Sequence, residues 1–172
     1  NFGSKKVNKN EKPELVSKIF STVSNKYDLM NDAMSFGLHR VWKEKMYLVT
    51  KLQDNETVLD IATGTGDIAL KLLNKRKNLN ITCLDENNDM LQLCKDRLID
   101  NGYIKDIKFL KSSIEDADLL KNYYSLATIA FGFRNFTDHS KALRNIYKSM
   151  LPGGRLVIME FSTPENNILQ NI

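Results

Sequence analysis

The chain has 172 residues, 42% of them apolar, which suffices for one globular domain with a buried core. Its net charge of +4 comes from scattered lysines and arginines without a long basic run, so the composition gives no indication of nucleic-acid binding. No apolar run approaches the roughly 18 residues of a membrane-spanning helix. Two cysteines, Cys83 and Cys94, are too few for a disulfide framework and are predicted to be packed thiols.

Two helices are predicted in the first 50 residues. Val16, Ile19, Phe20 and Val23 recur at helical spacing, and a second helix is predicted over 38–50. We interpret residues 1–50 as a helical lid or substrate segment that precedes the main sheet.

From residue 57 onward, strand and helix patterns alternate. Strands are predicted over 57–62, 80–85, 106–111, 125–131 and 154–161, and helices over 67–76, 88–101 and 138–150. This alternation predicts an α/β fold of the Rossmann-like kind, with a doubly wound, mostly parallel sheet over 51–172. Right-handed crossovers place the first strand at the centre of that sheet.

The last predicted strand has the composition of a strand buried inside a sheet. Only polar-leaning residues follow Leu156 to Phe161, so the sheet would end on a long apolar edge. We therefore expect further strands that this chain lacks, and interpret it as a C-terminally truncated fragment.

A glycine loop directly after the first strand is the most informative stretch of the sequence. Gly64 and Gly66 allow a sharp turn and a close approach to a ligand, and the spacing fits both a dinucleotide fingerprint and an S-adenosylmethionine site. Asp60 and Asp67 flank the loop and would repel the pyrophosphate of NAD. S-adenosylmethionine carries an ammonium, a sulfonium and a ribose diol, and the diol suits a carboxylate such as Asp85 at the end of the second strand.

Other polar residues follow strands at the same sheet edge. Ser113 and Arg134 come after the third and fourth strands, so we expect them to meet Asp60 and Asp85 at one crevice. No metal is expected, because the two histidines, His39 and His139, lack metal-ligand spacing.

Several segments carry a family resemblance that covers nearly the whole chain. Tyr27-Asp-Leu-Met-Asn31, His39-Arg-Val-Trp-Lys43 and Phe131-Gly-Phe-Arg-Asn135 resemble the UbiE-type ubiquinone/menaquinone biosynthesis C-methyltransferases. The resemblance implies transfer of a methyl group from S-adenosylmethionine to a ring carbon of a polyprenyl benzoquinol (2-polyprenyl-6-methoxy-1,4-benzoquinol) or of demethylmenaquinol. It also implies peripheral association with a membrane, where such substrates reside.

The resemblance assigns catalytic roles to Arg134, Asn135 and Tyr27. Arg134 supplies a fixed cation for the phenolate, because a phenol with a pKa near 10 must lose its proton before the ring carbon becomes strongly nucleophilic. Asn135 orients the hydroxyl or a water, and Tyr27 closes over the pocket in a water-mediated relay. The plain alternatives are that Arg134 pairs with an acid and that Tyr27 packs on the helical layer.

The glycine loop and the resemblance together define a cofactor site. We assign cofactor binding to Asp60, Thr63, Gly64, Thr65, Gly66, Asp85, Ser113, Ile114 and Ala130. The chain departs from the family pattern at two of these positions, since relatives carry Asp or Asn where Ser113 stands and Ser where Ala130 stands. Backbone N–H groups are expected to compensate for the two lost hydrogen bonds.

Two other functions remain open on the sequence. One is an NAD-linked oxidoreductase built on the same loop, and the other is a noncatalytic, methyltransferase-like scaffold subunit of a quinone-synthesis complex. A homodimer is a further expectation, through the unfinished sheet edge. The location is expected to be the matrix face of the mitochondrial inner membrane in a eukaryote, or the cytoplasmic face of the membrane in a bacterium.

Overall fold

The computed structural model describes residues 38–161, so the helix predicted around Val16 to Val23 and the candidate Tyr27 lie outside the described residues. The elements in chain order are α3 (Leu38–Thr50), β1 (Thr57–Ile61), α4 (Asp67–Lys75), β2 (Asn80–Asp85), α5 (Asn88–Asp100), β3 (Ile107–Lys111), β4 (Tyr124–Ala130), the short 3-10 helix η2 (Phe133–Asn135), α6 (His139–Ser149) and β5 (Met150–Met159).

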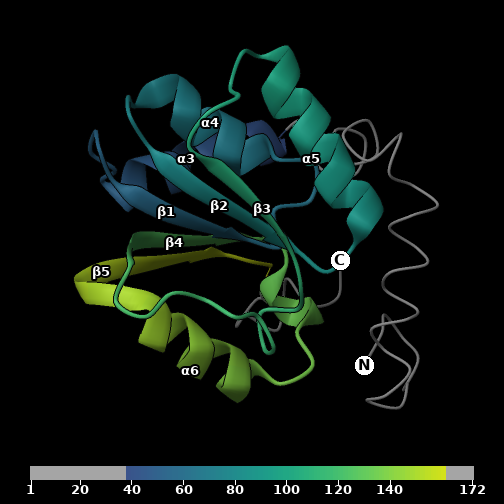
Figure 1. Ribbon diagram of the computed structural model, residues 1–172, viewed down its shortest axis with the longest axis vertical. Helices are drawn as coiled ribbons and strands as arrows, with labels where there is room; N and C mark the ends of the chain where they lie inside the picture. The colour runs from purple at the N-terminus through teal and green to yellow at the C-terminus, as the bar shows by residue number, and fades with distance from the viewer. Residues whose placement is uncertain (1–37, 162–172) are drawn as a thin grey trace, which may run out of the picture.

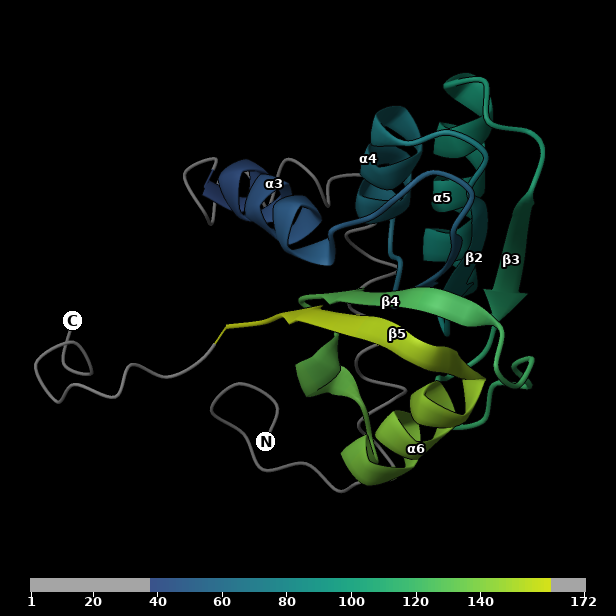
Figure 2. The same cartoon turned by 90° about the vertical axis from the view of Figure 1, so that its left-hand side faces the viewer.

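The described strands form one parallel sheet in the order β3-β2-β1-β4-β5. Helices α3, α4 and α5 cover one face, and α6 covers the other (Figures 1 and 2). The predicted doubly wound sheet with a central first strand is therefore confirmed. Because all five strands run the same way, the loops after their carboxyl ends meet at one edge.

Two apolar cores lie on opposite faces of the sheet. Side chains alternate along β1, so Val58 packs in the core under α3, α4 and α5, and Leu59 and Ile61 pack in the core against α6. Cys83 and Cys94 are both buried in the first core with free thiols, which confirms their predicted packing.

Helix α3 packs on the same core as α4 and α5. Met46 is buried in that core, and Glu44 accepts a hydrogen bond from Lys71 of α4 at 2.7 Å. Leu48 and Val49 are 65% and 63% exposed, so one side of the helix presents apolar surface.

The end of the sheet differs from the sequence prediction. Strand β5 pairs with β4 from Met150 onward and ends at Met159, whereas the strand was expected over 154–161. The register moves from Tyr124↔Met150 to Leu126↔Arg155, so the Pro-Gly-Gly segment forms an irregularity inside the strand. The prediction was wrong there because Pro and Gly normally end a strand.

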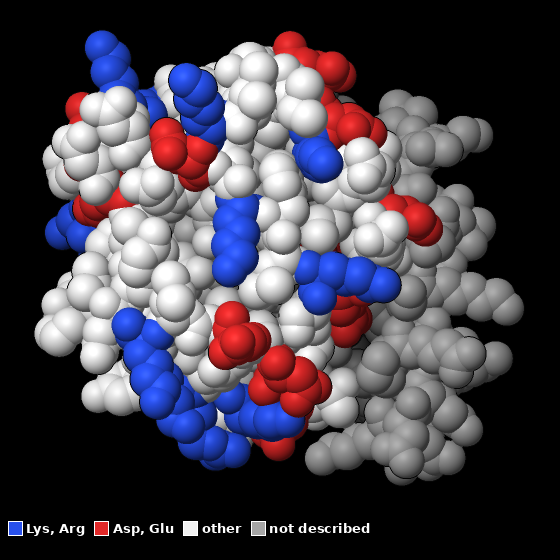
Figure 3. Space-filling model, viewed as in Figure 1, with Lys and Arg blue, Asp and Glu red and all other residues white. Residues whose placement is uncertain are grey.

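Among residues 38–161, no helix is long and apolar enough to cross a membrane. Lysines, arginines and acids are interspersed on the face shown in Figure 3.

Candidate functional site

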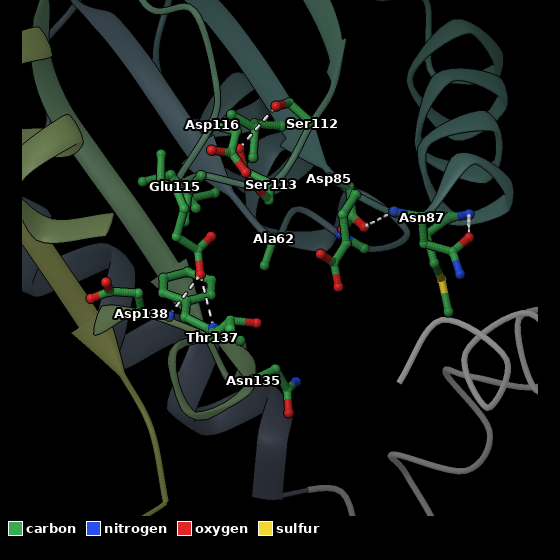
Figure 4. Close-up of a pocket in the computed structure, with 18 of the residues that line it drawn as sticks. Ala62, Asp85, Asn87, Ser112, Ser113, Glu115, Asp116, Asn135, Thr137 and Asp138 are labelled. Atoms are coloured by element: carbon green, nitrogen blue, oxygen red, sulfur yellow. Dashed lines mark hydrogen bonds between the residues drawn. The ribbon is translucent and has the colours of Figure 1, made fainter. Parts of the chain in front are cut away.

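A cavity of about 550 Å³ opens at the carboxyl edge of the sheet. In Figure 4, Asp85 and Asn87 lie on one side of it, Glu115, Thr137 and Asp138 lie on the other, and Ala62 lies between them. The lining residues follow the ends of β1, β2, β3 and β4: Ile61, Ala62, Gly64, Leu84, Asp85, Glu86, Asn87, Met90, Ser112, Ser113, Ile114, Glu115, Asp116, Ala130, Phe131, Gly132, Asn135, Phe136, Thr137, Asp138 and Lys141. The cavity is thus at the crevice that the parallel topology predicts.

The two loop glycines serve different purposes. Gly64 lines the cavity with a φ of +55°, and a Cβ built there would meet nothing within 4 Å. Gly66 has a φ of +81°, and a Cβ built there would lie 2.6 Å from the Sγ of Cys94. Gly64 therefore gives a ligand access to the backbone, whereas Gly66 lets α5 pack closely under the loop.

Asp85 is the buried carboxylate of the cavity. Its Oδ2 accepts a hydrogen bond from the Gly64 N–H at 2.8 Å, and its Oδ1 accepts one from the Asn87 N–H at 2.9 Å. Burial raises the pKa of Asp85, and these backbone hydrogen bonds oppose that rise. A carboxylate has about four acceptor sites, so Asp85 retains capacity for a diol in the cavity.

Asn87 fixes the position of Asp85 from the other side. Its side-chain oxygen caps α5 by accepting from the N–H groups of Asp89 at 2.9 Å and Met90 at 3.1 Å. The same residue therefore starts a helix and donates its own N–H to the carboxylate, which holds the β2–α5 turn in place beside the cavity.

Asp60 lies beneath the glycine loop and does not line the cavity. It is 1% exposed, and it accepts hydrogen bonds from the hydroxyls of Thr63 at 2.6 Å and Thr128 at 2.7 Å. Desolvation raises the pKa of Asp60 to about 6, although the two threonine hydroxyls lower it. Asp60 and Thr63 thus stabilise the glycine loop through a buried hydrogen bond beneath it.

Replacing Asp60 by asparagine is expected to change how stability depends on pH. The folded pKa is raised from 3.8 to about 6, so between these values the folded state holds more protons than the unfolded state. Stability therefore falls as the pH rises through this window, by about 3 kcal/mol in total. Urea unfolding at a series of pH values measures this slope, which Asp60→Asn should reduce.

Asp118→Asn is the matched control, because it removes one exposed negative charge. Urea unfolding of this variant at one pH gives the effect of losing a negative charge alone. Parallel curves for wild type and Asp60→Asn would contradict the assignment.

The charges that select the ligand are not the ones expected from the sequence. Asp67 pairs with Lys43 and Arg97 and does not line the cavity. Among the described residues that line it, the acids are Asp85, Glu86, Glu115, Asp116 and Asp138, and the only lysine or arginine is Lys141. An acidic cavity still disfavours a pyrophosphate and favours a cationic ligand such as S-adenosylmethionine.

The wall opposite Asp85 is built from the loop after β3 and the start of α6. The carboxylate of Glu115 accepts from the N–H groups of Thr137 at 2.8 Å and Asp138 at 3.2 Å. Ser113 donates to Asp116 at 3.1 Å, and Asp116 also pairs with Lys141 of α6. These contacts join two loops that are far apart in sequence into one wall of the cavity.

The segment after β4 lines a further part of the cavity. Phe131 has a φ of +59°, and a Cβ built on Gly132 would lie 2.5 Å from the Cβ of Ala62, so the loops after β1 and β4 touch at this glycine. Asn135 lines the cavity from η2. Arg134 is exposed and pairs with Glu160 at the end of β5.

The structure brings together part of the predicted site. Of the predicted residues that it describes, those that line the cavity are Gly64, Asp85, Ser113, Ile114, Ala130 and Asn135, and those that lie outside its lining are Asp60, Thr63, Thr65, Gly66 and Arg134. Thr65 is buried and accepts from Arg97 at 3.3 Å. The roles assigned to these residues and to Tyr27 stay predictions.

Sequence reasoning missed Asn87 and Glu115. Asn87 precedes a predicted helix and could have been found as an N-cap residue. Glu115 gave no signal, because its partners Thr137 and Asp138 are more than twenty residues away in the chain.

Comparison with known proteins decides the family. The model of the ubiE/COQ5 methyltransferase family matches residues 5–172. This chain belongs to that family. A ubiquinone/menaquinone biosynthesis C-methyltransferase UbiE of Rickettsia bellii is 43% identical to the chain over 176 residues, which cover 99% of this chain and 70% of the relative.

Solved structures share the fold at low sequence identity. A SAM-dependent methyltransferase from Aquifex aeolicus has a TM-score of 0.64 and 24% identity, covering 73% of this chain and 66% of that one. The [4+2]-cyclase SpnF has a TM-score of 0.71 and 16% identity, covering 84% and 59%. Since a cyclase shares this fold, the fold alone does not identify the reaction. Family membership confirms the predicted methyltransferase class and lends no support to the oxidoreductase or scaffold alternatives.

Proposed function

We propose that this chain is an S-adenosylmethionine-dependent C-methyltransferase of quinone biosynthesis. Its substrate is a polyprenyl benzoquinol, such as 2-polyprenyl-6-methoxy-1,4-benzoquinol, or demethylmenaquinol. The observation that carries the proposal is the acidic cavity between Asp85 and the Phe131–Asn135 segment, in a chain that belongs to the ubiE/COQ5 methyltransferase family. The name of the Rickettsia bellii relative supports the quinone substrate class.

The cavity residues fit the cofactor. Gly64 leaves the backbone accessible, Asp85 offers acceptors for the ribose diol, and the excess of acids suits a ligand with a sulfonium and an ammonium. When bound, S-adenosylmethionine supplies an electrophilic methyl group on sulfur. Ile114 and Met90 add apolar surface to the lining, which suits the flat adenine ring.

The residues after β4 fit the substrate chemistry. The ring carbon would receive the methyl group, with S-adenosylhomocysteine as the leaving product, and the ring proton would pass to a base or to water. Arg134 stabilises the phenolate that makes the ring carbon nucleophilic, because its guanidinium remains charged and presents a planar fork to an oxyanion. Asn135, which lines the cavity, orients the hydroxyl or a water.

The experiment that tests the function is methyl transfer from labelled S-adenosylmethionine to short-chain quinols by the full chain. Parallel assays with a methoxybenzoquinol and a demethylmenaquinol identify which ring is the acceptor. Arg134→Ala is expected to lower transfer by about 100-fold or more, with cofactor affinity unchanged in isothermal titration. Unchanged turnover in this variant would reject the role of Arg134, and lack of transfer to both quinols by the unmodified protein would reject the function.

We also propose peripheral association with a membrane, since a polyprenyl tail resides in the bilayer. Exposed apolar side chains of α3, including Leu48 and Val49, support this placement. The membrane would be the inner mitochondrial membrane or a bacterial cytoplasmic membrane, and a homodimer or a quinone-synthesis complex would be the assembly. Co-sedimentation with anionic and neutral vesicles tests the association, and protein that stays in the supernatant with both would contradict it.

A further inference from the structure

Glu160, at the end of β5, contacts Arg134 at two points. One carboxylate oxygen accepts from the backbone N–H of Arg134 at 3.0 Å, and the other accepts from Nη1 of the same residue. The second oxygen also accepts from the N–H of Phe161 at 3.0 Å. The side chain of Glu160 is 17% exposed, whereas that of Arg134 is 48% exposed. A largely buried carboxylate therefore binds both the backbone N–H and the guanidinium of an exposed arginine.

Arg134 also contacts an aromatic side chain, which in turn stacks on a second one. Its guanidinium carbon lies 5.5 Å from the ring centroid of Phe161, which is within the range of a cation–π contact. Phe161 stacks on Phe131 with ring centroids 4.7 Å apart, and Phe131 lines the cavity. The guanidinium is thus held against Phe161, next to the cavity. Arg134 is also the residue directly before Asn135.

We propose that Glu160 is a positioning residue, which holds the guanidinium of Arg134 in the orientation needed to meet the phenolate of the quinol. This inference rests on the proposed function and adds a positioning residue to the proposed reaction. An exposed ion pair alone contributes little to stability, with typical values of about 0–1 kcal/mol. Fixing the orientation of a charged group has a larger effect on rate, because a displacement of about 1 Å can reduce catalysis by about 100-fold.

The direction of the change in transfer rate distinguishes a positioning role of Glu160 from simple neutralisation of the Arg134 charge. If Glu160 only neutralised Arg134, removing it would strengthen the cation and raise the rate of transfer. If Glu160 orients Arg134, removing it frees the guanidinium and lowers the rate. The sign of the change therefore distinguishes the two.

The test compares Glu160→Ala, Arg134→Ala and the double variant in the full chain. Glu160→Ala is expected to lower kcat for methyl transfer by about tenfold or more, with the affinity for S-adenosylhomocysteine unchanged. The double variant should be no slower than Arg134→Ala, since both changes remove the same interaction. Glu160→Gln should fall between wild type and Glu160→Ala, because one amide oxygen still accepts a hydrogen bond. A raised or unchanged kcat in Glu160→Ala, or additive losses in the double variant, would overturn the proposal.

A second readout does not depend on turnover. A short-chain 2-methoxyphenol, which lacks the second hydroxyl and cannot form a quinone, is titrated into protein saturated with S-adenosylhomocysteine, and its phenolate is followed by difference absorbance. The unmodified protein is expected to bind the phenolate form at a pH below the phenol pKa, and both single variants should lose this signal. No phenolate signal in the unmodified protein, or an undiminished one in Glu160→Ala, would overturn the proposal. Phenolate binding without methyl transfer would reject the proposed function and leave the role of Glu160 standing.

Glu56→Ala is the matched control. Glu56 is a largely buried carboxylate that pairs with Arg155, in the middle of β5. This variant loses an arginine–carboxylate pair on β5 without disturbing Arg134, so its kcat and phenolate signal should match those of the unmodified protein.

Discussion

Replacing Asp85 by alanine is expected to weaken the binding of S-adenosylmethionine and S-adenosylhomocysteine by more than about tenfold, or about 1.4 kcal/mol. Asp85 is 8% exposed, lines the cavity and is held by the N–H groups of Gly64 and Asn87. A carboxylate fixed by two backbone donors is ready to accept from a ribose diol without reorganising. Isothermal titration of the full chain with both ligands measures the loss.

A ligand that lacks a ribose hydroxyl separates a direct role of Asp85 from a structural one. The 3′-deoxy form of S-adenosylhomocysteine should bind the unmodified protein more weakly, and should bind Asp85→Ala about as well as the complete ligand does. The effects of the Asp85 substitution and of the missing ribose hydroxyl are thus coupled, because each change removes the same hydrogen bond. Equal affinity of Asp85→Ala and unmodified protein for the complete ligand would reject the ribose role.

Asp116→Asn is the matched control for the cavity charge. Asp116 lines the opposite wall, where Ser113 and Lys141 contact its carboxylate. Its substitution removes one acidic group from the cavity and leaves Asp85 unchanged. The coupling to the ribose hydroxyl should therefore persist in Asp116→Asn.

The sheet could be predicted from the sequence because its signals are local. The limits of β2 agree with the prediction over 80–85, and those of α3 agree over 38–50. Each of these segments carries its own periodicity and its own flanking turn residues. The start of β5 was missed because Pro152 and Gly153 resemble a turn, and the strand runs past them only as an irregularity between the Tyr124↔Met150 and Leu126↔Arg155 pairs.

The candidate site could be predicted only where its chemistry follows directly from a strand end. Asp85 and Ser113 were found in this way and line the cavity. Contacts between distant segments have no local signal: Arg134 meets Glu160 because β4 and β5 are neighbours, and Gly66 meets Cys94 because α5 packs under the loop. The sequence thus indicated which residues carry charge, but the packing decides which charges reach the cavity.

The packing of Gly66 against α5 leads to the largest expected change in stability. Gly66→Ala places a Cβ 2.6 Å from the Sγ of Cys94, at a φ of +81° that strains any L-residue. Overpacking costs about 1–3 kcal/mol and the left-handed conformation about 1–2 kcal/mol. The free energy of unfolding, measured with urea, is therefore expected to fall by about 3 kcal/mol.

Two further variants separate the clash from the backbone strain. Gly102 has a φ of +83° and nothing within 4 Å of a built Cβ, so Gly102→Ala carries the strain alone and should lose only about 1–2 kcal/mol. Removing Sγ in the double variant Gly66→Ala/Cys94→Ala should recover part of the difference, although the Cβ of Cys94 remains 3.2 Å away. If Gly66→Ala and Gly102→Ala lose equal stability, contact with Cys94 is not what requires glycine at position 66. A larger loss that Cys94→Ala partly reverses would establish that the second loop glycine is required by helix packing, which leaves Gly64 as the glycine that serves the ligand.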